Sequence, residues 1–235
     1  MRQVELTMTI RRAVYAAIIS FLFLWCPGSL WGQDSDFQSW WEFEFDYSLG
    51  TSLQLEGELE QRFKNNSLQY SRTLLTAGLE YDAARWLSLG GAARVVFVGD
   101  SEGRVLPRYR IHFQATGSYD ISDFSFSLRT RLQYGFEDFL LFTDLRDNAL
   151  VIRNRLKGQY HIFGTKFSLF ATVESWHNLS KLPGPAFQNI RYSAGLRYGL
   201  NFTSAFSLRY IFEDEFNVNN PDRLHILLLS YDHSF

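Results

Sequence analysis

The sequence has a single cysteine and no long apolar run beyond its N-terminal segment. Cys26 stands alone among 235 residues, so an intramolecular disulfide cannot form and a small disulfide-stabilised secreted domain is excluded. The longest apolar stretch, residues 13–25, has 13 residues, whereas a helix that spans a membrane needs about 20. These two absences argue against a disulfide scaffold and against a helical membrane protein.

The N-terminal segment has the order of parts that is typical of a secretory signal peptide. Arg2, Arg11 and Arg12 precede the apolar run, and small and polar residues follow it. We therefore expect residues 1–32 to be a cleaved signal peptide and residues 33–235 to form one exported domain.

An excess of charge of one sign is also lacking. Three of the 23 basic residues and one of the 25 acidic residues precede residue 33, so the exported part carries a net charge of −4. This near balance predicts no nucleic-acid partner, which a basic surface would indicate. The sequence has no His-Glu-x-x-His motif, no paired cysteines and no regular Asp-x-Asp-x-Asp spacing. We therefore predict no cofactor and no metal centre.

What the sequence does have is an alternation of apolar and polar residues that persists from residue 37 to the end. Residues 124–134 read FSFSLRTRLQY, in which apolar side chains alternate with Ser, Arg and Gln side chains. A period of two places one set on each face of a β-strand. The same reasoning predicts eleven strands, at residues 37–48, 51–63, 69–82, 86–98, 107–119, 123–136, 148–161, 166–176, 188–199, 205–214 and 224–235.

The predicted strands are long, and tight turns alternate with longer loops between them. Most strands have about 10–15 residues, whereas strands of soluble domains average about 5–6 and tilted membrane strands need about 9–11. Aromatic residues gather towards strand ends, as they do at the interfaces of a membrane barrel. A soluble β-sandwich or lipocalin-type barrel would share the alternation, but not these three features together. The predicted fold class is all-β, a transmembrane antiparallel up-and-down β-barrel over residues 33–235.

The number of strands conflicts with the usual rule for such barrels. Bacterial single-chain barrels have an even number of strands, with long loops outside and short turns in the periplasm. With eleven strands and the C-terminus in the periplasm, the first strand would begin on the extracellular side, whereas the N-terminus of such barrels lies in the periplasm. We therefore predict about twelve strands, with ten as the alternative. Either a strand near residues 33–52 is missed, or residues 33–37 pass through the lumen.

Several segments resemble an uncharacterised family of outer-membrane proteins, domain of unknown function 2490. The segments are WWEFEFDYSLGTSLQLEGELEQRF, RYRIHFQ, SLRTRLQY, VIRNRLKGQY and HILLLSYDHSF, within residues 37–235. The resemblance implies a barrel in the bacterial outer membrane, in contact with lipid and lipopolysaccharide, and no known activity. The last segment has Leu229, Tyr231 and Phe235 on one face and resembles the assembly signal of outer-membrane proteins. It implies that the strand ending at Phe235 binds the barrel-assembly machinery.

In a membrane barrel the polar face of each strand lines the lumen, and here its charges are unevenly distributed. The basic side chains predicted to line the lumen and contact a solute are Arg94, Arg108, Arg110, Arg129, Arg131, Arg153, Arg155, Lys157, Arg191 and Arg197. The opposing acidic wall is predicted from Glu42, Glu44, Glu56, Glu58, Glu60 and Glu80. Arginines bind carboxylates in a bidentate manner, so small anionic solutes are the predicted cargo.

Three functions fit this lumen. Facing Arg and Glu rows form either an ion-paired structural lattice or the walls of a small, passive, porin-like channel, and we favour these over catalysis. The alternative is an outer-membrane enzyme, a lipase or lipid A-modifying enzyme, with His177 and Ser180 as the rim candidates. We predict no catalytic residue. The apolar segment FLLF, residues 139–142, has three open roles: a constriction of the mouth, a lipopolysaccharide contact or a partner contact.

Overall fold

The computed structural model describes residues 35–99, 103–136, 149–217 and 221–235. These residues form eleven β-strands and one short 3₁₀ helix, η1 (Leu179–Lys181). Within these ranges no α-helix occurs, and no helix has the length and apolarity needed to cross a membrane.

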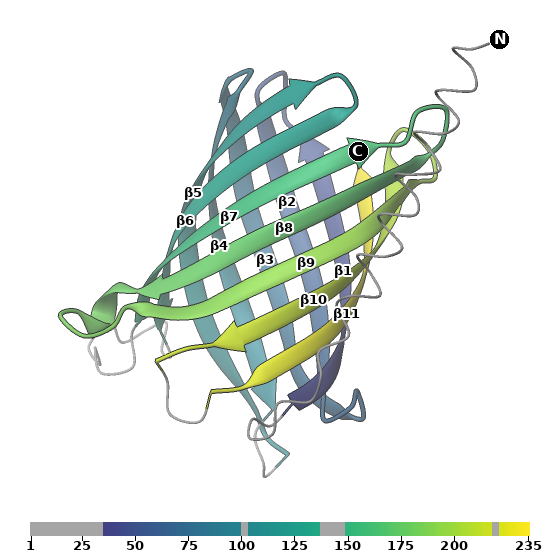
Figure 1. Cartoon of the computed structure of the whole chain (residues 1–235). Helices are drawn as coiled ribbons and strands as arrows, with labels where there is room; N and C mark the ends of the chain where they lie inside the picture. The colour runs from purple at the N-terminus through teal and green to yellow at the C-terminus, as the bar shows by residue number, and fades with distance from the viewer. Residues whose placement is uncertain (1–34, 100–102, 137–148, 218–220) are drawn as a thin grey trace, which may run out of the picture. The chain divides into compact units, whose positions relative to one another are not determined.

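The strands follow one another along the chain and form a closed barrel (Figure 1). Their bounds are β1 (Ser35–Ser48), β2 (Leu53–Lys64), β3 (Gln69–Ala84), β4 (Leu87–Gly99), β5 (Val105–Ile121), β6 (Phe124–Phe136), β7 (Ala149–His161), β8 (Phe167–Asn178), β9 (Phe187–Gly199), β10 (Ser204–Glu215) and β11 (Arg223–Ser234). Each bound lies within two residues of the predicted one, because the alternation of side chains and the turn residues mark both ends of each strand.

The barrel closes between its first and last strands, which run parallel. Ser35 lies opposite Arg223 and Asp46 opposite Ser234, whereas every other neighbouring pair is antiparallel. The prediction of twelve strands, with ten as the alternative, is therefore wrong, since the described residues form eleven. An up-and-down barrel needs an even number of strands only if its first and last strands pair in an antiparallel manner. Here the parallel ladder gives the free edges of β1 and β11 their hydrogen-bond partners, so closure needs no further strand.

The two ends of the barrel differ in their connections. We call the end at which β1 finishes the turn end, because connections of two to five residues join the strands there, at 49–52, 85–86, 122–123, 162–166 and 200–203. The opposite end is the loop end, where β1 begins. At the turn end the backbone N–H of Phe235 donates to the carbonyl oxygen of Asp46 at 2.8 Å, which ties the end of β11 to β1.

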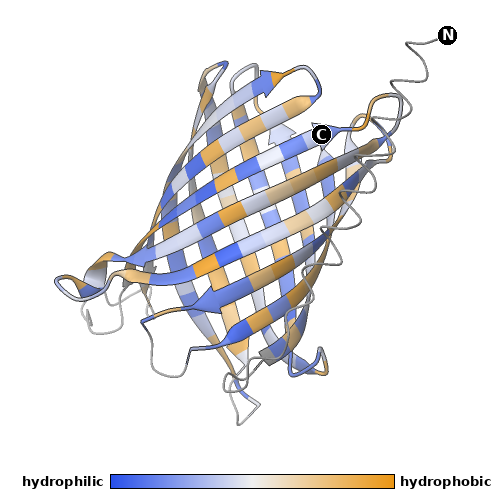
Figure 2. Ribbon diagram, viewed as in Figure 1, coloured by the Kyte–Doolittle hydropathy of each residue, from blue (hydrophilic) through white to orange (hydrophobic). Residues whose placement is uncertain are grey.

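The outer face of the barrel is apolar and the inner face is mostly polar. On β6, the side chains of Phe126 and Leu128 point outward and are 46% and 54% exposed, while Arg129 and Arg131 line the interior. Figure 2 shows the resulting alternation of hydrophobic and hydrophilic residues along the strands. This arrangement inverts that of a soluble barrel, which buries its apolar side chains inside.

One part of the interior is apolar, next to the closing strands. Trp40 of β1, Ile211 of β10, and Ile226 and Leu228 of β11 form a cluster in which no side chain is more than 3% exposed. This cluster was not predicted, because β11 carries apolar residues on both faces and alternation cannot distinguish them.

Candidate functional site

The interior of the barrel holds two adjoining cavities of about 390 Å³ and about 270 Å³. We call the larger one the turn-side cavity, since Asp46 and Asp232 near the turn end line it. The smaller one is the loop-side cavity, which Trp40 and Arg62 line. Seven residues line both cavities and mark where they meet: Glu44, Glu58, Arg94, Arg129, Arg131, Arg155 and Arg209.

Most of the predicted solute-lining residues lie in these cavities. The basic ones that line one or both cavities are Arg94, Arg110, Arg129, Arg131, Arg153, Arg155, Lys157, Arg191 and Arg197. The acidic ones are Glu42, Glu44, Glu56, Glu58, Glu60 and Glu80. Arg108 differs, because it is exposed close to the loop end and lines neither cavity.

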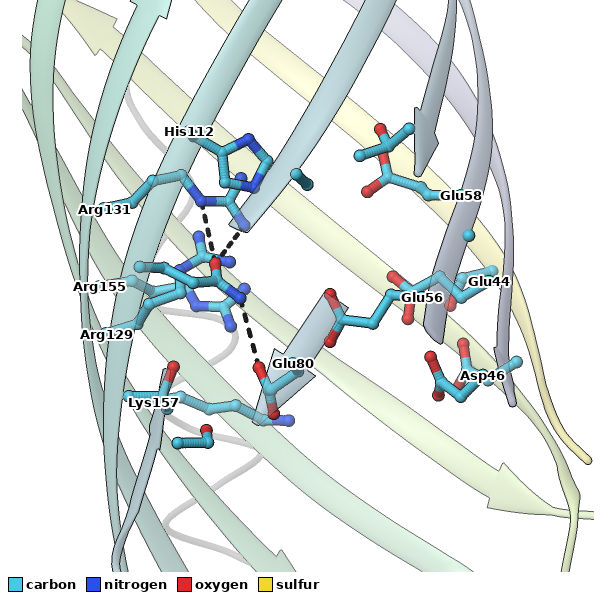
Figure 3. Close-up of a pocket in the computed structure, with 18 of the residues that line it drawn as sticks. Glu44, Asp46, Glu56, Glu58, Glu80, His112, Arg129, Arg131, Arg155 and Lys157 are labelled. Carbon is cyan, nitrogen blue, oxygen red and sulfur yellow. Dashed lines mark hydrogen bonds between the residues drawn. The ribbon is translucent and has the colours of Figure 1, made fainter. Parts of the chain in front are cut away.

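The predicted acidic residues lie across the lumen from many of the predicted basic residues. The predicted acidic residues come from β1, β2 and β3, and many of the basic ones come from β5, β6 and β7. In the order of the barrel, β6 and β7 lie four and five strands from β2, which is nearly halfway around. Figure 3 shows Arg129, Arg131 and Arg155 on one side of the turn-side cavity, with Glu44 and Glu56 on the other. The two walls therefore create an electric field across the lumen.

Some of the lumenal charges are neutralised by ion pairs. Arg94 crosses the lumenal face of β3 and donates from Nη2 to both carboxylate oxygens of Glu58, at 2.8 and 2.9 Å. The remaining lumenal pairs that involve β1, β2, β9, β10 or β11 are Arg62 with Glu60, Arg191 with Glu213, and Arg197 with Asp232. In each of these pairs neither partner is an isolated charge, which would be costly in a low-dielectric interior.

Glu174 of β8 is the counter-charge of the basic wall. Arg129 donates from Nη2 to Glu174 Oε1 at 2.9 Å, and Arg153 donates from Nε and Nη2 to the same oxygen at 3.2 and 3.0 Å. The Glu174 side chain is 5% exposed, which makes these charge-assisted hydrogen bonds strong.

Other lumenal charges have no ion-pair partner among the described residues. The carboxylates that have no cationic nitrogen of that part of the chain within 4.0 Å are Glu42, Glu44, Asp46, Glu56 and Glu80. Among the cations that line the two cavities, those without a carboxylate oxygen of the described chain within 4.0 Å are Arg110, Arg131, Arg155, Lys157 and Arg209. The interior is therefore not a fully ion-paired lattice.

Gln114 of β5 lies between the two walls. Its Oε1 accepts from Nε and Nη2 of Arg131, at 3.1 and 2.6 Å, and its Nε2 donates to Glu80 at 3.4 Å (Figure 3). The amide thus places its oxygen on the basic side and its nitrogen on the acidic side.

The loop-side cavity is narrowed by stacked tryptophan and arginine side chains. The guanidinium carbon of Arg191 lies 5.2 Å from the ring centre of Trp40 and 4.7 Å from that of Trp176. The guanidinium carbon of Arg62 lies 3.5 Å from the ring centre of Trp40, and that of Arg153 lies 4.7 Å from the ring centre of Trp176. Each of these contacts is a cation–π interaction that holds an arginine against an aromatic face.

Sequence reasoning missed three charged residues of the lumen: Arg209 and Glu213 of β10, and Asp232 of β11. The alternation that placed the others also places these, since Leu208 and Tyr210 flank Arg209 and point outward. The carboxylates of Glu42, Glu58 and Glu60 form one group within 4.8 Å of one another, but arginines already bind two of them.

The rim candidates for catalysis, His177 and Ser180, each form a hydrogen bond with a residue other than the other candidate. The His177 imidazole lies 3.3 Å from the Ser175 hydroxyl and packs against the Phe187 ring. The Ser180 hydroxyl instead accepts from the backbone N–H of Leu150 at 2.9 Å. Residues 139–142 lie outside the described part of the chain.

These features define a class of protein, a closed β-barrel with an apolar outer face and a charged interior. The chain belongs to the family described as "Protein of unknown function (DUF2490)", whose model matches residues 37–225, and the resemblance predicted from the sequence is confirmed. A comparison with curated proteins finds no match.

The barrel is similar to those of solved outer-membrane proteins. A NanC porin shares 14% identity with a TM-score of 0.50, and the alignment covers 81% of this chain and 93% of that chain. LpxR from Salmonella typhimurium shares 13% identity with a TM-score of 0.49, over 77% of this chain and 83% of that chain. At these identities the likeness extends to the fold alone.

Proposed function

We propose that this protein is a small, passive channel in the bacterial outer membrane. The observation that carries the proposal is the pair of adjoining lumenal cavities with unpaired charges on both walls. The cavities give polar solutes space, and the outward apolar side chains give lipid a matching surface.

A membrane location accounts for the outer face. Strands of 12 to 17 residues are long enough to cross a hydrocarbon core at a tilt, for which about 9–11 residues are needed. Aromatic side chains are exposed near the turn end, as in the girdles of membrane barrels: Tyr47, Tyr81, Trp86, Tyr119 and Phe202. In water, this continuous apolar surface would favour aggregation.

A channel also accounts for the charges better than a structural lattice does. An isolated charge in a dry interior costs several kcal/mol, so a sealed plug would pair each one. The Nε atoms of Arg129, Arg155 and Arg209 are buried and have no hydrogen-bond acceptor among the described residues. Water or a solute in the lumen would supply the missing partners.

The basic wall favours solutes that carry a carboxylate. Guanidinium groups present several N–H donors in a plane that matches a carboxylate, and Arg131, Arg155 and Arg209 line both cavities without an ion-pair partner in the described chain. A solute on its way through the lumen would pass these three side chains where the cavities meet.

The channel can be tested by blocking it from inside. Ser207 of β10 lines the turn-side cavity, and its neighbour Leu208 points outward, 49% exposed. We expect a bulky, charged thiol reagent to reduce the current through Ser207→Cys in planar bilayers and to leave Leu208→Cys unchanged. Cys26→Ser is included in both, to remove the native thiol. Equal currents before and after labelling of Ser207→Cys would contradict the proposal.

A further inference from the structure

The charges without ion-pair partners are balanced between the walls. Among the charged residues that line the two cavities, five carboxylates, all on β1, β2 and β3, and five cations, four of them on β5, β6 and β7, have no ion-pair partner in the described chain. The paired residues add one further cation, because Glu174 pairs with both Arg129 and Arg153. A lumen lined by one sign of charge attracts ions of the opposite sign. Two facing walls of opposite charge and similar size favour neither sign strongly, because each wall repels the ion that the other attracts.

Gln114 indicates which solute such a lumen favours. Its amide is a dipole held between the walls, with the oxygen 2.6 Å from Arg131 Nη2 and the nitrogen 3.4 Å from Glu80 Oε2. The two hydrogen bonds hold this dipole with its negative end towards a basic residue and its positive end towards an acidic one. A solute with a full negative charge at one end and a full positive charge at the other would be stabilised more strongly.

We propose that the lumen selects small zwitterionic solutes, with the carboxylate towards Arg131, Arg155 and Lys157 and the ammonium towards Glu44 and Glu56. The inference rests on the proposed channel function and narrows its solute. A simple anion meets attraction from one wall and repulsion from the other, whereas a zwitterion satisfies both. The walls carry donors for the carboxylate, since the buried Nε of Arg155 has no acceptor in the described chain.

Two isomers make a matched pair of probes. Glycine and glycolamide have the same atoms, but glycine is a zwitterion and glycolamide is neutral at pH 7. We expect proteoliposomes that contain the full-length barrel to swell several-fold faster in glycine than in glycolamide. In a KCl gradient across a planar bilayer, we expect a reversal potential close to zero.

Variants of the unpaired carboxylates test the acidic wall. Neither Glu44 nor Glu56 has an ion-pair partner among the described residues, so Glu44→Gln with Glu56→Gln is expected to leave the barrel folded. We expect this double variant to lose the preference for glycine and to become anion-selective. The control is Arg223→Gln, because Arg223 pairs with Asp214 and lines neither cavity. It is expected to keep the preference, and heat-modifiable migration on a gel checks folding of each variant.

The outcomes separate this inference from the proposed function. If neither isomer nor any ion enters through the folded barrel, the channel itself is refuted and the inference falls with it. If both isomers enter at the same rate, or the wild type strongly prefers anions or cations, the channel stands and zwitterion selection is wrong. Unchanged glycine preference in the double carboxylate variant would also overturn it.

Discussion

Replacing Glu174 with glutamine should destabilise the barrel through its basic wall. Glu174 accepts three hydrogen bonds from Arg129 and Arg153, between 2.9 and 3.2 Å, and all three side chains are at most 12% exposed. Glutamine keeps the volume and one acceptor oxygen but loses the charge, which leaves both arginines uncompensated beside Arg155. Hydrogen bonds to charged groups contribute about 1.5–3 kcal/mol each, and breaking a buried pair costs about 3–5 kcal/mol. Since water in the proposed channel would screen part of this interaction, we expect a loss of about 3 kcal/mol.

The assay is equilibrium unfolding in urea of the barrel refolded into lipid bilayers, followed by tryptophan fluorescence. Glu80→Gln is the matched control, because Glu80 has no ion pair in the described chain and accepts one hydrogen bond of 3.4 Å from Gln114. We expect this control to change the free energy of unfolding by less than about 1 kcal/mol. Equal effects of the two variants would refute the view that Glu174 stabilises the basic wall.

Three further predictions follow from the packing. Trp40→Ala should lower the free energy of unfolding by about 3–5 kcal/mol, because Trp40 packs against Ile211, Ile226 and Leu228, and should raise the single-channel conductance by widening the loop-side cavity. Unchanged stability and conductance would contradict that role. Gly57→Val should displace the Phe45 ring, which occupies the position of an added Cβ, and should reduce folding yield relative to Gly135→Val, where the nearest atom is 3.8 Å away. Brominated lipid should quench the fluorescence of Trp41, which points outward and is 46% exposed, and Trp41→Phe should remove more of that quenching than Trp176→Phe. If Trp176→Phe removed more of the quenching than Trp41→Phe, the assignment of the outer face to lipid would be wrong.

Local pattern was sufficient to predict the strands and most of the lumenal residues. The alternation in β6 assigns Phe126 and Leu128 to one face and Arg129 and Arg131 to the other, and the structure has this assignment. A period of two is a property of each strand alone, so it needs no knowledge of the strand's neighbours.

The features that were missed depend on contacts between distant residues. The parallel pairing of β1 with β11 joins residues nearly two hundred positions apart, and no local pattern reports it. The apolar cluster around Trp40 was missed because both faces of β11 are apolar. The position of Gln114 depends on side-chain conformations at both of its partners, Arg131 and Glu80, and spacing along the chain does not encode these.

The most direct test of the channel is the single-channel current of the folded, full-length barrel in a planar bilayer of symmetrical KCl. We expect discrete current steps whose size grows with the KCl concentration, because ions cross the lumen between the acidic and basic walls. A barrel that migrates on a gel as a folded protein, inserts into the bilayer and yet passes no current above the background would contradict the account. Its lumen would then be a structural lattice rather than a passage.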